Sequence, residues 1–139
     1  MKNPAAILAR RAMAIGVLSL IVVGASSCDD SPTAPTAPAI ATFQVGSETF
    51  SVRLTTDEQV KAAEAAQNGG PAKIPVGRIV PGADVNAGWT WHLEDVKFAE
   101  ATIELCDGRP SDVEKMGTKF GEGQYCPWSA KVTEIEPAS

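Results

Sequence analysis

The only histidine of the chain, His92, is the side chain best suited to acid–base chemistry near neutral pH. Asp95 follows it closely and Asp107 lies further along the chain, and either carboxylate could orient the imidazole as in a hydrolase. The chain has no Gly-x-Ser-x-Gly motif, and a single histidine excludes a metal site built from several histidines. The sequence therefore allows a small hydrolase that uses His92, but it does not specify one.

Aromatic and acidic side chains supply the other candidates for ligand binding. Trp89, Trp91 and Trp128 could form an aromatic platform for a sugar or a peptide, although tryptophans in a small domain more often belong to its core. The strand-like alternation places Trp89 and Trp91 on one side and His92 on the other. Asp107 begins an acidic segment that lacks the carboxylate spacing of a calcium loop, so we predict neither a metal nor a cofactor.

The three cysteines divide between two roles. Cys28 follows the small residues Ala25-Ser26-Ser27, as in a bacterial lipobox, and is predicted to carry a lipid anchor. Cys106 and Cys126 are then predicted to form a disulfide in an oxidising compartment, with a stabilising contribution of roughly 3 kcal/mol. A redox-active pair would need closer spacing, such as Cys-x-x-Cys.

The amino-terminal part of the chain has the features of an export signal. Residues 1–27 combine a positively charged start with an apolar segment that is too short to span a bilayer. Residues 28–40 are rich in proline and threonine and predict an extended tether, which leaves residues 41–139 as a single globular domain. We expect the protein to be exported and anchored to the bacterial envelope through Cys28. The alternative is cleavage by ordinary signal peptidase, which would release a soluble secreted domain.

The exported part is acidic. The whole chain has a net charge of -5, and removing Lys2, Arg10 and Arg11 with the export signal leaves 9 basic and 17 acidic side chains, a net charge of -8. Such a surface disfavours nucleic acid as a partner. Because the acidic residues are scattered, they indicate a solvated surface first and a cationic partner second.

Alternating apolar residues predict strands, and capping-box spacings predict two helices. The predicted elements are strands over residues 43–45, 50–54, 73–80, 89–93, 97–106 and 128–135, with helices over residues 55–67 and 111–120. Pro75 places its strand at an edge or at a bulge, the strand over 97–106 is expected to be central, and Ser111 with Glu114 is expected to cap the second helix. The predicted fold is α+β, a small antiparallel sheet with two helices packed on one face in a βαββαβ-like order. A mostly β barrel with short helices is the alternative.

Four segments together resemble a known family: ETFSVRLTTDEQVKAA, GRIVPG, GWTWHLEDVKFAEATIELCDGRPSDVE and YCPWSAKV. The family is the amino-terminal domain of the seventy-four-kilodalton calmodulin-binding protein, which is also found in bacterial secreted proteins. The resemblance covers residues 43–132, and among its most specific parts are Trp91-His92-Leu93 and Cys126-Pro127-Trp128-Ser129. It implies a small exported domain with two cysteines that match Cys106 and Cys126, and it carries over no catalytic residue.

Calmodulin is not an expected partner in spite of the family's name. A calmodulin target helix is basic and amphipathic, whereas the predicted helical segment Asp57–Gln67 carries only Lys61 against three acidic residues. The favoured function is a non-catalytic binding module for an envelope or extracellular protein, or for a small ligand. A protease inhibitor that uses the loop Pro81–Gly88 is the second hypothesis, and the His92 hydrolase is the third.

Overall fold

The computed structural model describes residues 35–71, 73–100 and 104–139, with the side chain of Glu104 left aside. The predicted export signal, Cys28 and the first part of the tether lie outside these ranges. Within the described ranges, no helix is long and apolar enough to cross a membrane.

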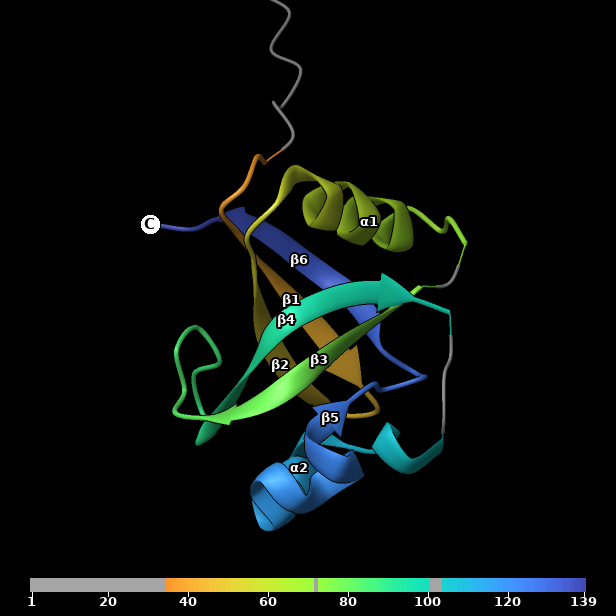
Figure 1. Cartoon of the computed structure of the whole chain (residues 1–139). Coiled ribbons are helices and arrows are strands. Elements are labelled where there is room, and N and C mark those ends of the chain that lie inside the picture. The colour runs from red at the N-terminus through yellow and green to blue at the C-terminus, as the bar shows by residue number, and fades with distance from the viewer. Residues whose placement is uncertain (1–34, 72, 101–103) are drawn as a thin grey trace, which may run out of the picture. The chain divides into compact units, whose positions relative to one another are not determined.

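Six strands form two antiparallel sheets of three strands each (Figure 1). The first sheet has the order β2-β1-β6, with the bounds β1 Ala39–Val45, β2 Glu48–Leu54 and β6 Lys131–Pro137. The second has the order β4-β3-β5, with the bounds β3 Ile74–Pro81, β4 Trp91–Ala99 and β5 Gln124–Tyr125. Alternate residues of β1 and β2 are buried, as the predicted hairpin requires. β1 begins at Ala39, two residues before the predicted start of the globular domain.

Two α-helices lie at opposite ends of the strands (Figure 1). Their bounds are α1 Asp57–Gln67 and α2 Pro110–Met116, and two 3-10 segments are η1 Glu104–Cys106 and η2 Gly117–Gly123. The predicted capping box of α1 forms, because the Thr56 hydroxyl accepts a hydrogen bond from Gln59 N at 3.3 Å while the Gln59 side chain accepts one from Thr56 N.

The predicted cap of the second helix is wrong. α2 begins one residue earlier, and the Asp112 carboxylate accepts a hydrogen bond from Arg109 N at 3.0 Å. Ser111 instead donates from both its N–H and its hydroxyl to the Glu48 carboxylate, and Glu114 accepts from Thr90. Tertiary partners thus take the two side chains that the local spacing had paired.

The α+β class, with antiparallel strands, two helices and one disulfide, is confirmed, and the strands do not close into a barrel. The strands divide between two sheets, so the helices cover different elements: α1 packs against β6 and β4, and α2 packs against β2. The predicted central strand over residues 97–106 is wrong as drawn, because β4 ends at Ala99 and is an edge strand.

The Cys106–Cys126 disulfide explains where that predicted strand ends. Its Cα atoms lie 5.1 Å apart, both cysteines are buried, and Cys126 N donates a hydrogen bond to Cys106 O at 2.8 Å. The residues before Cys106 form the 3-10 segment η1 beside the chain that follows β5. The disulfide therefore joins η1 to that chain and does not join the last strand to a central one.

Pro75 predicted an edge or bulged position for its strand, and β3 is bulged but central. The pairing of β3 with β4 shifts between Val76 and Arg78, and the opposing Asp95 has a positive φ of 52°. β5 pairs only with Gly77 and Arg78, so no strand within the described ranges pairs with Pro75 on that side. A proline is tolerated there because no ladder hydrogen bond needs its missing N–H.

Aromatic rings from both sheets form the centre of the core. Phe50 lies 5.3 Å from Phe43 and 5.3 Å from Tyr125, and Trp91 lies 5.6 Å from Tyr125, measured between ring centroids. The Tyr125 hydroxyl donates to Gly108 O at 3.0 Å, and burial of the ring raises the pKa of Tyr125. The two sheets are thus held together by packing at their faces, and not by strand pairing between β2 and β4.

Candidate functional site

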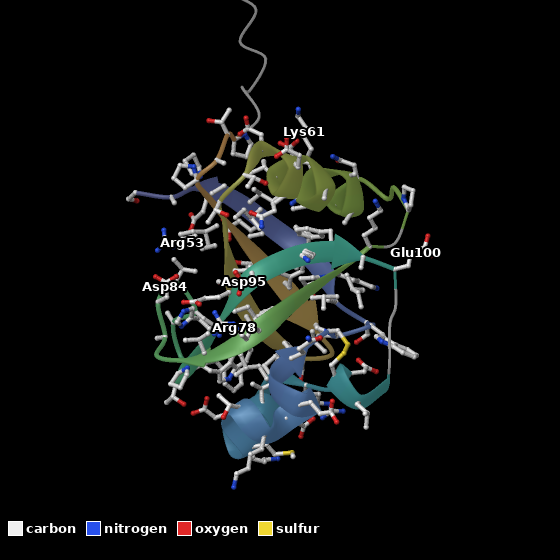
Figure 2. The ribbon with its side chains drawn as sticks, viewed as in Figure 1. Arg53, Lys61, Arg78, Asp84, Asp95 and Glu100 are labelled. Atoms are coloured by element: carbon white, nitrogen blue, oxygen red, sulfur yellow. A yellow bond between two sulfur atoms is a disulfide. The ribbon has the colours of Figure 1, made fainter. Side chains whose placement is uncertain are left out.

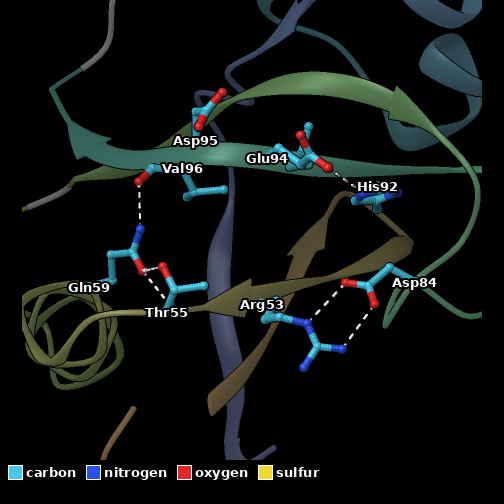
Figure 3. A pocket seen from close by; sticks show the side chains of 9 residues that line it. Arg53, Thr55, Gln59, Asp84, His92, Glu94, Asp95 and Val96 are labelled. Atoms are coloured by element: carbon cyan, nitrogen blue, oxygen red, sulfur yellow. Dashed lines mark hydrogen bonds and ion pairs between the residues drawn. The ribbon is translucent and has the colours of Figure 1, made fainter. Parts of the chain in front are cut away.

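A groove of about 540 Å³ lies where the free edges of the two sheets approach each other (Figure 3). β2 is an edge of the first sheet and β4 is an edge of the second. The end of β2, the start of α1, the β3–β4 loop and β4 contribute the lining residues Arg53, Thr55, Gln59, Asp84, His92, Leu93, Glu94, Asp95 and Val96. Its volume falls within the usual range of ligand sites.

The register of β2 decides which of its main-chain groups face this groove. Val45 and Glu48 pair directly across a two-residue turn, so alternate residues from Glu48 onward bond to β1. Thr49, Ser51 and Arg53 therefore direct their N–H and C=O groups away from β1. Two observed bonds agree, since Ser51 N donates to the Asn86 side chain and Thr49 O accepts from the Trp89 indole.

The same reasoning applies to β4. Gly82 N donates to Thr90 O at 2.8 Å, so the alternation makes His92 and Glu94 the residues that bond to β3. Trp91 and Leu93 therefore direct their main-chain groups away from β3, toward β2. The observed bond from Asn86 Nδ2 to Trp91 O confirms this direction.

The Asn86 side chain bridges the two edges at one end of the groove. Its Oδ1 accepts from Ser51 N of β2 at 2.9 Å, and its Nδ2 donates to Trp91 O of β4 at 2.9 Å. Asn86 is 1% exposed, and its own N–H and C=O bond to Ala83 O and Trp89 N within the loop. The amide thus stands where one peptide unit of an intervening strand would stand.

The Gln59 side chain bridges the edges at the other end. Its Nε2 donates to Val96 O of β4 at 2.7 Å, and its Oε1 accepts from Thr55 N, just after β2, at 2.6 Å (Figure 3). Gln59 belongs to the first turn of α1 and is half-buried. A second side-chain amide therefore takes the place of a second peptide unit.

Arg53 and Leu93 lie between these two bridges. Each is an outward-facing position of its edge strand, and no strand within the described ranges pairs with either edge. Ser51, Trp91, Thr55 and Val96 find side-chain amide partners, whereas the edge at Arg53 and Leu93 borders the groove. The main-chain groups of these two residues are available to a ligand.

Charged side chains form the walls of the groove (Figures 2 and 3). The Arg53 guanidinium binds both oxygens of Asp84 at 2.9 and 3.1 Å, and this hydrogen bonding lowers the pKa of Asp84 and raises the pKa of Arg53. Arg78, which lies outside the lining, pairs with Glu94 and Asp95. Three carboxylates against one guanidinium in the lining leave the walls negatively charged, and they remain so when Arg78 is counted.

His92 lies in this groove, and its partners do not form a hydrolase triad. Its Nδ1 lies 2.6 Å from Gly82 O, which places the proton on Nδ1, and its Nε2 lies 3.4 Å from Glu94 Oε1. Asp95 lines the same groove but pairs with Arg78, whereas Asp107 accepts a hydrogen bond from Trp128 N at 2.8 Å and does not line the groove.

A nucleophile beside His92 is also missing from the groove lining. Thr55 carries the only hydroxyl among the lining residues, and that hydroxyl donates to Gln59 Oε1 at 3.2 Å. The pair Cys106 and Cys126 is oxidised to a disulfide. Within the described ranges, no group of three or more histidine, cysteine, aspartate or glutamate side chains could hold a metal ion.

The three tryptophans do not form one platform. Trp91 is 2% exposed and belongs to the core, while Trp89 is half-buried with its indole donating to Thr49 O at 2.8 Å. Trp128 is 38% exposed and lines a separate groove of about 450 Å³ together with Lys73 and Lys131. Only Trp128 is placed to stack on a solvent-borne ligand.

The residues that define the site were mostly outside the sequence candidates. Of those candidates, only His92 lines the groove between the sheet edges. The capping-box spacing signalled Gln59, but only as a cap. Asn86 and Asp84 belong to a loop that was expected to be ordered, and no local pattern marks their partners because these lie more than thirty residues away in Ser51 and Arg53.

These features define a small, disulfide-containing α+β domain with a polar groove between the free edges of two sheets. The family model for the N-terminal domain of the seventy-four-kilodalton calmodulin-binding protein matches residues 37–139, and the chain belongs to this family. The match confirms the resemblance seen in the sequence. No curated protein and no solved structure matches the chain.

Proposed function

We propose that the protein is an exported, lipid-anchored and non-catalytic binding module, and that the groove between β2 and β4 holds its ligand. The features of residues 1–40 support export, anchoring at Cys28 and a tether that holds the domain away from the membrane. The partner is an envelope or extracellular molecule.

One observation carries the proposal: two side-chain amides bridge the sheet edges at both ends of the groove and leave the edge at Arg53 and Leu93 between them. Exposed strand edges promote uncontrolled pairing, so proteins usually cover them. Here Asn86 and Gln59 cover the edges on either side of a groove of ligand size. The arrangement favours recognition, and the absence of a nucleophile beside His92 in the lining favours it over hydrolysis.

Site-specific photocrosslinking in the native envelope tests this proposal. The crosslinking amino acid p-benzoylphenylalanine would replace Thr55 in the groove or, as the matched control, Met116 of α2, which is exposed and lines no groove described above. We expect a discrete crosslinked product from position 55 that is absent from position 116. Identical products from both positions, or none from position 55, would contradict the proposal.

A second candidate function is inhibition of an extracellular protease by the β3–β4 loop. The loop projects from the domain (Figure 1), and Gly82, Ala87 and Gly88 are exposed while the buried Asn86 holds its base. A loop that is rigid before binding loses little entropy on entering an active site. Slowing of one protease by the full chain, reversed by Ala87→Asp, is the expected result. A panel of serine, cysteine and metalloproteases that all run at their normal rates would exclude this candidate.

A further inference from the structure

We infer that the ligand of the groove is a short, extended and positively charged peptide segment, which adds its main chain to the sheet edges at Arg53 and Leu93. The inference rests on the proposed function, because it names the ligand of the same groove. It follows from the hydrogen-bonding requirements of the groove floor together with the charge of its walls.

The floor of the groove requires a ligand that can donate and accept hydrogen bonds on two opposite sides. Arg53 presents an N–H and a C=O from β2, and Leu93 presents the same pair from β4. An extended peptide meets this requirement, because its successive residues direct their N–H and C=O groups to alternate sides. Such strand addition is a recurrent mode of peptide recognition.

The protein itself shows that an amide fits between these two edges. The Asn86 amide joins Ser51 N to Trp91 O with two bonds of 2.9 Å, and the Gln59 amide joins Thr55 N to Val96 O. A primary amide and a peptide unit have the same donor and acceptor geometry. The strands are therefore already spaced for a peptide group between them, and Arg53 and Leu93 form the position that the chain's own amides leave to a partner.

The available length is short. Ser51 and Thr55 are four residues apart, which corresponds to about 13 Å along an extended strand. Asn86 and Gln59 occupy the two ends of this interval. The inserted part of the ligand thus spans about two residues, and the flanking residues of the peptide lie along the walls of the groove.

The walls select the side chains of the peptide. Asp84, Glu94 and Asp95 line the groove against a single cation, Arg53. Glu94 and Asp95 are exposed, and the Asp84 side chain is 35% exposed, so a lysine or arginine of the ligand can reach them without displacing core residues. A basic segment is complementary to this surface, and an acidic segment is repelled.

The test uses the full chain in detergent and two labelled peptides of the same length, acetyl-Val-Lys-Val-Lys-Val-amide and acetyl-Val-Glu-Val-Glu-Val-amide. Fluorescence anisotropy measures their dissociation constants. We expect binding of the lysine peptide, with the glutamate peptide at least about tenfold weaker because of the wall charges. Equal affinity for both peptides, or no binding of either, would overturn the inference.

A matched pair of variants tests the main-chain contact. Arg53→Ala and Arg53→Pro both remove the guanidinium, but only proline removes the N–H that faces the groove. The substitution suits an edge strand, because Arg53 N does not bond to β1. We expect Arg53→Pro to bind the lysine peptide about tenfold more weakly than Arg53→Ala, and equal affinity of the two variants would contradict strand addition.

A change in the ligand provides the same test if Arg53→Pro does not fold. The lysine peptide with N-methyl groups on its main chain keeps its charge but loses its donors, so we expect it to bind the unaltered protein at least about tenfold more weakly. Undiminished binding would overturn the inference.

The crosslinking experiment separates the two proposals. A partner crosslinked at position 55 without any peptide binding would uphold the proposed function and overturn this inference. Peptide binding with the expected variant effects, but with no crosslinked partner in the envelope, would support the inference about ligand chemistry and contradict the proposed envelope partner. A crosslink from position 55 to the same chain would show that an internal segment occupies the groove, and it would overturn both.

Discussion

Asn86 and Gln59 make the same chemical connection at the two ends of one groove, yet they do so under different conditions. Each side-chain amide accepts a hydrogen bond from the β2 side and donates one to β4. Asn86 is 1% exposed and belongs to a loop whose main chain it also bonds, whereas Gln59 is half-buried on the first turn of α1. The groove therefore has one end enclosed in the protein and one end near solvent.

This difference separates a structural role from an adjustable one. If Asn86 moved, two main-chain groups in a dry environment would lose their partners, which costs far more than a bond that water can replace. If Gln59 moved, water could reach Thr55 N and Val96 O. A ligand could thus extend the groove at the Gln59 end, but not at the Asn86 end.

Replacing the buried amide tests the first half of the comparison and has the largest expected effect. Asn86→Ala leaves Ser51 N–H and Trp91 C=O without their partners, so we expect the free energy of unfolding to fall by about 3 kcal/mol. Urea denaturation measured by tryptophan fluorescence gives this value. A loss smaller than that of Gln59→Ala would reverse the comparison.

Replacing the half-buried amide should cost less. Gln59→Ala removes the capping box as well as the bridge, and we expect a loss of about 1 kcal/mol in the same denaturation assay. Gln59→Glu is the matched control, since a carboxylate still accepts from Thr55 N and Thr56 N but cannot donate to Val96 O. If the two variants lose the same amount, the bridge to β4 carries the stability of this side chain; if the glutamate variant is unchanged, the cap carries it.

The comparison also shows which parts of the structure the sequence could predict. Alternation gave the hairpin of β1 and β2, capping-box spacing gave the start of α1, and the export context gave the Cys106–Cys126 pair, because each depends on nearby residues or on composition. The predicted strand over residues 97–106 failed because alternation cannot register the bulge at Asp95 or the bond that holds Cys106 beside Cys126.

The site was less predictable than the fold for a related reason. Its residues are ordinary polar side chains whose roles arise only when β2 and β4 approach each other. Arg53 looks like any solvent-facing residue of a strand, and Asn86 looks like any loop asparagine. Arg78 is the instructive exception, since its position beside Gly77 at the end of an element predicted an ion pair with an acidic neighbour, and it pairs with Glu94 and Asp95.

The Arg53–Asp84 ion pair provides the smallest and most selective test, because it joins β2 to the loop of Asn86 from the solvent side. Asp84 has a positive φ of 44°, which asparagine tolerates as well as aspartate, so Asp84→Asn removes the charge without straining the backbone. Both side chains are more than a third exposed or close to it, so solvent screening limits the expected loss at pH 6 to about 0.5 kcal/mol.

The pH dependence of that loss has a definite sign. Hydrogen bonding to Arg53 lowers the pKa of Asp84 in the folded protein, so the ion pair contributes fully above the ordinary aspartate pKa of about 3.9. Its contribution disappears as the pH falls through the lower folded pKa, because both states then bind the proton. We therefore expect the stability difference between the unaltered protein and Asp84→Asn, measured by urea denaturation, to be constant from pH 7 to pH 5 and to vanish near pH 2. A difference that persists at pH 2 would mean that Asp84 supports the loop through its shape, in which case the buried Asn86 and the exposed Asp84 act as one structural unit.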